Sequence, residues 1–269
     1  MPPESINDAG DPRLADYRNV PDAELLRARG VFVAEGRLVV RRLLTASRFP
    51  ARSVLVTETA YLALDDLLAA TPVPVYVVPP ALLGHITGFD IHRGCLALGE
   101  RHDRADWRAL TAAGRRLVIL ERVGNADNVG SIFRNAVAFG ADGVLLDETS
   151  TDPLYRKAIR TSMGAALSLP FARMDGWPES LTLLRKRGVT TIGLVPSATQ
   201  TIRDVARMTE GKRIGLLLGH EGEGLSPGAI AHCDHLACVP MAAGIDSLNV
   251  ATAAAVALYE IAASRSRSA

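Results

Sequence analysis

Three polar blocks in the second half of the chain carry the residues best suited to chemistry. The first, at 128–134, reads NVGSIFR and contains an amide and a guanidinium. The second, at 219–226, reads GHEGEGLS and sets Glu221 within a glycine-rich turn. The third, at 240–250, reads PMAAGIDSLNV and adds a serine and an asparagine. Such groups can orient a polar substrate, and an arginine can anchor a phosphate or a carboxylate.

Each block also has a purely structural interpretation. Asn128 can cap the helix that follows it, with Arg134 on the surface of that helix. The glycine-rich segment can be an ordinary turn, and Ser247 can cap the last helix with Asn249 in its first turn. The glycine pattern is neither the dinucleotide-binding fingerprint nor a P-loop. The blocks taken singly therefore leave a ligand site and a set of caps and turns as open alternatives.

The elements predicted for the second half would bring the blocks together. Short apolar runs alternate there with helical patterns, which is typical of a parallel sheet covered on both faces. Because α/β proteins bind ligands at the carboxyl ends of parallel strands, polar loops in those places are candidate sites. The predicted strands are 117–120, 143–146, 190–195, 214–218 and 236–239, and the predicted helices are 129–139, 177–187 and 247–263.

The first half repeats the alternation on a smaller scale and predicts a second α/β domain. Its predicted helices are 21–29, 37–46 and 62–70, and its predicted strands are 31–36, 53–56, 73–78 and 94–98. We expect a flexible tail over 1–16, a smaller domain over 17–100, a charged linker over 101–114 and a larger domain over 115–269.

Composition excludes several classes of protein. No apolar run approaches the ~20 residues of a membrane span, and the first residues lack the pattern of a signal peptide. Net charge is +1, so any nucleic-acid site must be a local positive patch. Cys95, Cys233 and Cys238 show neither disulfide nor zinc spacing, although His232 and His235 lie beside the last two. We therefore expect no metal and a cytoplasmic, reducing location.

Taken in order, the three blocks resemble the motifs of the SpoU/TrmH-type RNA ribose 2′-O-methyltransferases of the SPOUT superfamily. The segments NAVAFGA at 135–141 and RTSMGA at 160–165 resemble further stretches of that family. In the first half, FVAEG at 32–36 and HRG at 92–94 resemble the substrate-binding domain often fused to these enzymes. One departure is Ala251, where many relatives carry serine.

The resemblance implies a fold, a cofactor and a substrate. It implies a C-terminal SPOUT α/β domain with a deep trefoil knot, preceded by a smaller α/β RNA-binding domain, and a homodimer formed through the C-terminal domain. The implied reaction is methyl transfer from S-adenosylmethionine to a ribose 2′-hydroxyl of RNA, with ribosomal RNA favoured over transfer RNA. The implied active-site residues are Asn128, Arg134, Glu221, Ser247 and Asn249. The implied cofactor contacts are Val195, Ser197, Gly219, Val239, Met241 and Leu248.

Other functions stay open at this point. Within the same class, the chain is compatible with a transfer RNA methyltransferase or with an enzyme of thiopeptide resistance. A catalytically silent RNA-binding or assembly protein is the main alternative from another class, and the intact polar residues argue against it. A nucleotide-binding oxidoreductase is disfavoured by the missing dinucleotide fingerprint.

Overall fold

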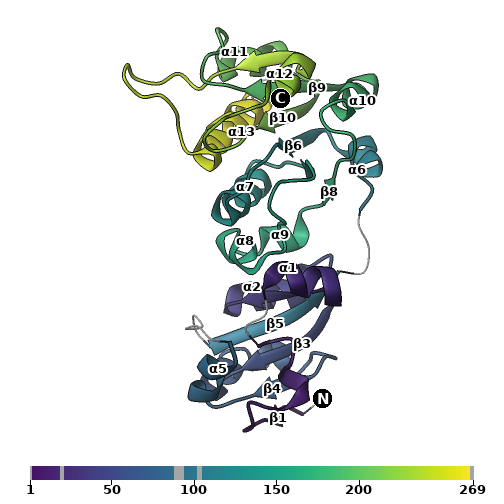
Figure 1. The fold of residues 1–269 in the computed structure, drawn as a ribbon, viewed down its shortest axis with the longest axis vertical. Coiled ribbons are helices and arrows are strands. Elements are labelled where there is room, and N and C mark those ends of the chain that lie inside the picture. Colours follow the sequence, from purple (N-terminus) through teal and green to yellow (C-terminus); the bar gives the residue numbers. More distant parts are fainter. Residues whose placement is uncertain (1, 19–20, 88–93, 102–104, 267–269) are drawn as a thin grey trace. The chain divides into compact units, whose positions relative to one another are not determined.

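The computed structural model divides the chain into two compact units (Figure 1). The first consists of Met1–Asp103 with Pro153–Ser168, and the second of Arg104–Asp152 with Leu169–Ala269. A segment from the middle of the chain therefore packs with the N-terminal residues. The residues that the structure describes are 2–18, 21–87, 94–101 and 105–266.

The first unit is built on a five-stranded sheet in the order β1-β4-β3-β5-β2. Strand β5 runs antiparallel to both of its neighbours, whereas the β1–β4 and β3–β4 pairs are parallel. The strands are β1 (Glu4–Ser5), β2 (Val31–Glu35), β3 (Ala51–Val56), β4 (Val75–Val77) and β5 (Cys95–Glu100). The helices are η1 (Pro12–Leu14), α1 (Asp22–Glu24), η2 (Leu25–Arg29), α2 (Arg37–Ala46), α3 (Glu58–Leu62), α4 (Asp65–Leu68), α5 (Pro80–Thr87), α8 (Arg156–Thr161) and α9 (Ala165–Ser168).

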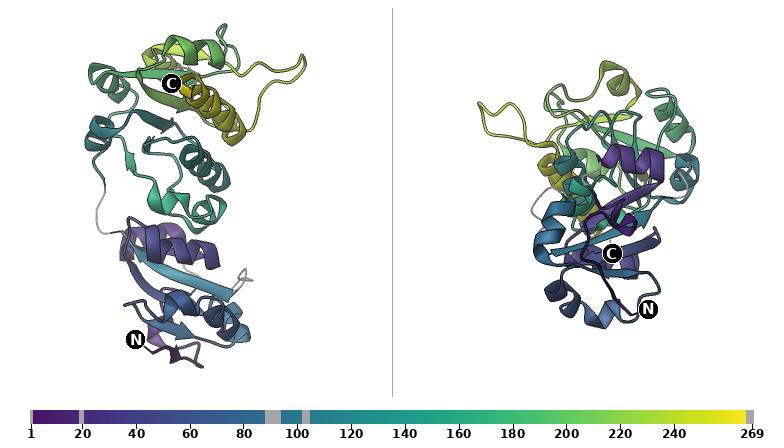
Figure 2. Two further views of the ribbon diagram at one scale, coloured as in Figure 1. Left: turned by 180° about the vertical axis from the view of Figure 1, so that it is seen from behind. Right: turned by 60° about the horizontal axis from the view of Figure 1, so that its bottom comes forward.

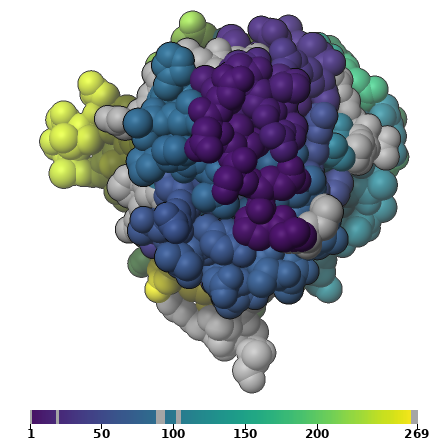
Figure 3. Space-filling view, turned by 90° about the horizontal axis from the view of Figure 1, so that it is seen from below, coloured from purple at the N-terminus to yellow at the C-terminus, as the bar shows by residue number. Residues whose placement is uncertain are grey.

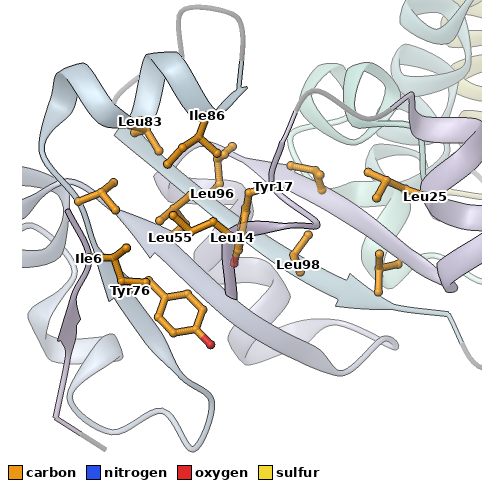
Figure 4. Packing of buried hydrophobic residues seen from close by; sticks show 13 residues of the cluster. Ile6, Leu14, Tyr17, Leu25, Leu55, Tyr76, Leu83, Ile86, Leu96 and Leu98 are labelled. Atoms are coloured by element: carbon orange, nitrogen blue, oxygen red, sulfur yellow. The ribbon is translucent and has the colours of Figure 1, made fainter. Parts of the chain in front are cut away.

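The N-terminal residues, expected to be flexible, are packed into the core of this unit. Strand β1 pairs with β4, and the side chains of Ile6 and Leu14 are buried. They join Tyr17 in one apolar cluster (Figure 4), and the Tyr17 hydroxyl lies 2.8 Å from the Ser53 hydroxyl. In the space-filling view the N-terminal segment, in purple, lies across the part of the unit that follows it in sequence, in blue (Figure 3). Apolar side chains at only a few positions of a polar segment are therefore enough to hold it.

One further prediction for this unit needs correction, and another falls on residues that the structure does not describe. The helix predicted over 62–70 is two short helices, because Thr57 caps α3 by accepting from the Ala60 amide at 3.3 Å and α3 ends at Leu62. Leu64 then has a non-helical backbone where α4 begins. His92 and Arg93 of the HRG segment lie outside the described residues.

The second unit contains a six-stranded, wholly parallel sheet in the order β11-β9-β10-β6-β7-β8. Its strands are β6 (Arg116–Leu120), β7 (Gly143–Leu146), β8 (Phe171–Arg173), β9 (Val189–Leu194), β10 (Arg213–Leu218) and β11 (His235–Ala237). Its helices are α6 (Trp107–Ala113), α7 (Ala126–Ala138), α10 (Ser180–Lys186), α11 (Ile202–Met208), α12 (Pro227–His232) and α13 (Val250–Ser266). All five strands predicted for this half are present, and the three-residue β8 is an addition.

The order of the strands explains why distant blocks meet. Strands β6 and β10 are neighbours in register, with Leu120 opposite Leu218, so the first two blocks leave the sheet side by side. The loop from β11 to α13, which carries the third block, projects from the body of the unit (Figure 2). Helix α13 then packs against α7 and α11. Across the described residues, no helix combines the length and apolar character needed to cross a membrane.

Candidate active site

Helix α7 carries the first block, and its N-terminus is fixed by Asn125. The Asn125 side chain accepts a hydrogen bond from the Asp127 amide at 2.8 Å and is the N-cap. Asn128 lies inside the first turn, so the alternative in which it only caps the helix does not hold. Because Asn125 is the cap, the side-chain amide of Asn128 can contact the other two blocks.

Glu221 joins the first two blocks. Its carboxylate accepts hydrogen bonds from Asn128 Nδ2 at 3.0 Å, from the Asn125 amide at 3.1 Å and from the Gly124 amide at 3.4 Å. Partial burial raises the pKa of the Glu221 carboxyl, but the hydrogen bonds outweigh it and hold that pKa below its ordinary value. Glu221 is therefore an anion at neutral pH that fixes the orientation of the Asn128 amide.

Asn249 extends this network to the third block. Its Nδ2 donates to Asn128 Oδ1 at 2.9 Å, while its Oδ1 accepts from the Ala251 and Thr252 amides at 2.9 and 3.2 Å. Asn249 thus caps α13, and Ser247, the other candidate cap, lies exposed in the loop before it. Because the oxygen of Asn249 reaches the free amides, the alternative in which Ser247 is the cap does not hold.

The glycine-rich second block is a tight hairpin held by His220. The His220 and Gly224 backbones exchange hydrogen bonds of 3.1 and 2.9 Å. The ring Nδ1 of His220 accepts from the Gly222 and Glu223 amides at 3.0 and 3.1 Å, so the proton of the neutral ring is on Nε2. Gly219 is packed so closely that a Cβ there would lie 2.3 Å from the Gly224 carbonyl carbon. His220 was not among the predicted site residues, although its place beside Glu221 could have indicated it.

A second carboxylate, Glu121, binds Ser226, which follows this hairpin in the sequence. It is 1% exposed and accepts from Trp177 Nε1 at 2.8 Å, the Ser226 amide at 2.8 Å and the Ser226 hydroxyl at 2.6 Å. The sequence interpretation missed this role. Its only local signal is a charge that follows directly after a buried strand.

A cavity of about 330 Å³ opens between the hairpin, the ends of β9 and β10, and the loop before α13. Five of the six predicted cofactor contacts line it, namely Val195, Gly219, Val239, Met241 and Leu248. Ser197 is exposed and is not part of the lining. Glu221 and Ser247, two of the predicted active-site residues, also line the cavity. His220, Glu223 and Asp246, which were not predicted, line it as well. Apolar walls with backbone polar groups and an acidic edge suit a cationic organic ligand.

Arg134 stands apart from this assembly. Its side chain is exposed on α7, does not line the cavity, and makes no hydrogen bond or ion pair with the described residues. The structure therefore brings together Asn128, Glu221 and Asn249 by hydrogen bonds and places Ser247 in the same cavity wall as Glu221. It does not bring Arg134 into contact with them.

The described residues contain no group of three or more His, Cys, Asp or Glu side chains able to hold a metal ion. Burial, with a smaller contribution from nearby Asp234, raises the pKa of the Cys233 thiol to about 12. A thiolate is the form of cysteine that binds metals, and this thiol stays protonated near neutral pH.

Comparison with known proteins identifies the family of this chain. Residues 115–259 match the SpoU rRNA Methylase family. A tRNA/rRNA methyltransferase of Mycobacterium bovis is 38% identical over 96% of this chain and 91% of its own length. The AdoMet-bound rRNA methyltransferase of Sinorhizobium meliloti superposes with a TM-score of 0.81 at 25% identity, covering 96% of this chain and 97% of that one. The SpoU methyltransferase AviRb of Streptomyces viridochromogenes gives 0.80 at 25% identity, with 96% and 99% covered. The chain belongs to the SpoU family of RNA methyltransferases.

Proposed function

We propose that this protein transfers a methyl group to a ribose 2′-hydroxyl of RNA, with ribosomal RNA favoured over transfer RNA. The observation that carries the proposal is the hydrogen-bonded series Asn249–Asn128–Glu221 beside the cavity. It fixes two amides and a carboxylate from three separate segments, which is the preorganisation that orienting a hydroxyl requires. The Sinorhizobium meliloti neighbour, described as acting on ribosomal RNA, supports the choice of substrate.

The cofactor is S-adenosylmethionine, which supplies an electrophilic methyl group on a positively charged sulfur. The cavity fits it in charge, because Glu221, Glu223 and Asp246 lie in its lining. It fits in shape as well, because Gly219 lets the hairpin backbone form a wall without side-chain bulk. Val239 and Met241 add apolar surface of the kind that an adenine ring contacts.

Methyl transfer requires the protein to orient the reacting groups and to stabilise charge. S-adenosylmethionine would supply the methyl carbon to the ribose 2′-oxygen and leave as the neutral thioether S-adenosylhomocysteine, while the hydroxyl proton would pass to water. A hydroxyl is a weak nucleophile, so we assign Asn128 and Ser247 to hold the ribose and the cofactor in line. Asn249 keeps Asn128 in place through the 2.9 Å hydrogen bond.

Arg134 is assigned to an RNA phosphate and to stabilising the charge that develops on the ribose oxygen. A guanidinium keeps its proton at any physiological pH, so it is poorly suited to act as the base. Its exposed side chain, without a protein partner among the described residues, is available for such a contact. We further propose a cytoplasmic homodimer formed through residues 115–269, with the trefoil knot in that part of the chain.

Mapping ribose methylation in total RNA, with and without the protein, tests the reaction. We expect a ribose 2′-O-methyl mark in ribosomal RNA that disappears with the protein and with the Asn128→Ala variant. A lost base methylation would contradict the ribose assignment, and a mark lost only from transfer RNA would change the substrate. If no mark is lost although the cofactor binds, the protein is a silent RNA-binding member of the family. Cofactor binding is measured separately, since a ligand at 100 times its Kd stabilises the native state by about 2.7 kcal/mol.

A further inference from the structure

We propose that helices α2 and α8 of the first unit form a phosphate-binding surface for RNA, organised by the buried carboxylate of Glu35. The choice of RNA as the partner rests on the proposed function. The surface is distinct from the cavity of the second unit, and it draws on residues 156–164, which follow the first motif in sequence.

Positive charge is concentrated in the two segments that form this surface. Residues 37–48 contain four arginines and no acidic residue, and residues 156–164 contain Arg156, Lys157 and Arg160 with no acidic residue. The other residues of 1–100 contain six arginines against twelve aspartates and glutamates. The net charge of the whole chain is only +1, yet these two short segments contain seven cations. A polyanion is attracted by such a local concentration of positive charge.

The two segments lie against each other within the first unit. Helix α2 packs on α9, and α8 packs on β2. The Arg48 amide donates to the Leu167 carbonyl at 2.9 Å. Arg42 lies directly over Gly164, where an added Cβ would be 3.0 Å from the Arg42 Cδ. Arg42 and Arg48 therefore lie against the chain that follows α8 directly.

Glu35 holds the arginines of α8 from below. It ends β2 and is 3% exposed, with its carboxylate 3.6 Å from Arg160 Nη1 and 3.9 Å from Arg156 Nε. Its Oε1 has no hydrogen-bond partner among the described residues, so the attraction to Arg160 is one of charge alone. A buried carboxylate is costly without a cation beside it, so this arrangement keeps the arginines near it. The Arg160 side chain is 52% exposed, and its donors stay available to an outside acceptor.

The chemistry of this surface fits a chain of phosphates. Guanidinium groups donate two parallel hydrogen bonds to a phosphate, and several cations on adjacent helices match a polymer that carries one charge per nucleotide. Arg41, on the same helix, differs from its neighbours because both of its terminal nitrogens bond Asp66 at 2.9 and 3.0 Å. It is therefore already neutralised and serves as the matched control.

The test measures binding of the full chain to a fluorescein-labelled RNA stem-loop by anisotropy over a series of salt concentrations. The triple variant Arg42→Gln, Arg48→Gln, Arg160→Gln should bind at least about tenfold more weakly at low salt, since three phosphate contacts are lost. The slope of log Kd against log salt should fall by about 2 to 3. Arg41→Gln should change neither quantity by more than about twofold.

The variant Glu35→Gln separates positioning from net charge. It removes a negative charge, so a surface acting by charge alone would bind RNA more tightly. If Glu35 positions Arg156 and Arg160, the variant binds about threefold or more weakly, with unchanged cofactor affinity as the sign that the second unit is intact. Tighter binding would overturn the role of Glu35. Should this variant not fold, the triple variant, made of surface residues, still decides the proposal.

The proposal and the proposed function fail in different ways. A triple variant that binds RNA like the wild type, while the wild type methylates ribose, overturns the surface and leaves the function. Wild-type protein that binds RNA through this surface and methylates no ribose overturns the function alone. If the triple variant loses binding to phosphatidylglycerol vesicles but retains RNA binding, the surface binds membranes and the proposal is overturned.

Discussion

At the level of single residues, Arg134 differs from the other predicted site residues because it is exposed and lies outside the cavity. We predict that Arg134→Ala lowers the rate of methyl transfer by about 10²–10³, the usual effect of losing an electrostatic contact to the transition state. Cofactor affinity should stay nearly unchanged because Arg134 does not touch the cavity lining. Single-turnover methylation of the mapped RNA, beside a cofactor titration by calorimetry, measures both.

The variant Arg134→Lys serves as the control for geometry. An ammonium is a point charge and lacks the planar fork of the guanidinium, so we expect a substantial loss of rate here too. Full activity in the lysine variant would show that charge alone is enough. A loss of cofactor affinity in Arg134→Ala would instead move this residue into the cofactor site.

His220 is the residue that the structure adds to the site. We predict that His220→Ala weakens cofactor binding by about tenfold, because the Gly222 and Glu223 amides lose their acceptor and the cavity wall loosens. His220→Asn keeps a side-chain oxygen at a similar reach and should bind nearly as well as the wild type. Calorimetry gives the affinities, and faster hydrogen exchange at the two amides should accompany the alanine variant. Equal affinity of the alanine variant and the wild type would remove His220 from this role.

At the level of elements, the strands of the second unit could be predicted and the capping residues could not. Buried runs such as Leu117–Leu120 are recognisable because a parallel strand is apolar on both faces. Caps at Asn128 and Ser247 were open alternatives in the sequence, whereas in the structure Asn125 caps α7 and Asn249 caps α13. A cap is decided by which side chain reaches the free amides, and several candidates stand within three residues in each block.

The hairpin of the second block makes a prediction about glycine. At Gly219 an added methyl group would meet the Gly224 and Leu225 backbone within 2.5 Å, and backbone atoms cannot yield as a side-chain end does. We predict that Gly219→Ala lowers the stability by about 1–3 kcal/mol and abolishes cofactor binding. Gly222→Ala is the control, since its Cβ would come no closer than 3.6 Å to the His220 ring. Thermal unfolding of both variants decides, and equal melting temperatures would contradict the argument.

At the level of the whole molecule, the grouping of residues 153–168 with the first unit could not be read from the sequence. The RTSMGA segment follows the first motif along the chain, so it was counted with residues 115–269. Its place depends on contacts between distant residues, such as the Arg160–Glu35 pair and the hydrogen bond from Arg48 to Leu167. No local pattern encodes such contacts, whereas the order of the three polar blocks was enough to identify the family.

Helix α13 carries apolar residues on all of its sides. Such a helix is normally covered on every face, yet Tyr259 is 56% exposed. Val137 on α7 is 44% exposed as well, and α7 packs against α13, with Phe139 and Tyr259 in edge-to-face contact at 6.1 Å. We predict that this face joins two copies in a homodimer, since a symmetric pair covers the same patch on both chains.

Light scattering at micromolar concentration should give twice the chain mass for the wild type and for Leu62→Glu, a control at an exposed leucine of the first unit. The double variant Val137→Glu, Tyr259→Glu should be monomeric, because carboxylates facing each other across the interface repel and lose their hydration. Arg134 lies one turn before Val137 on α7, so the interface would lie beside it, and the monomer should retain cofactor binding but lose transfer. A monomeric wild type, or a double variant that stays dimeric and active, would place the contact elsewhere or remove it.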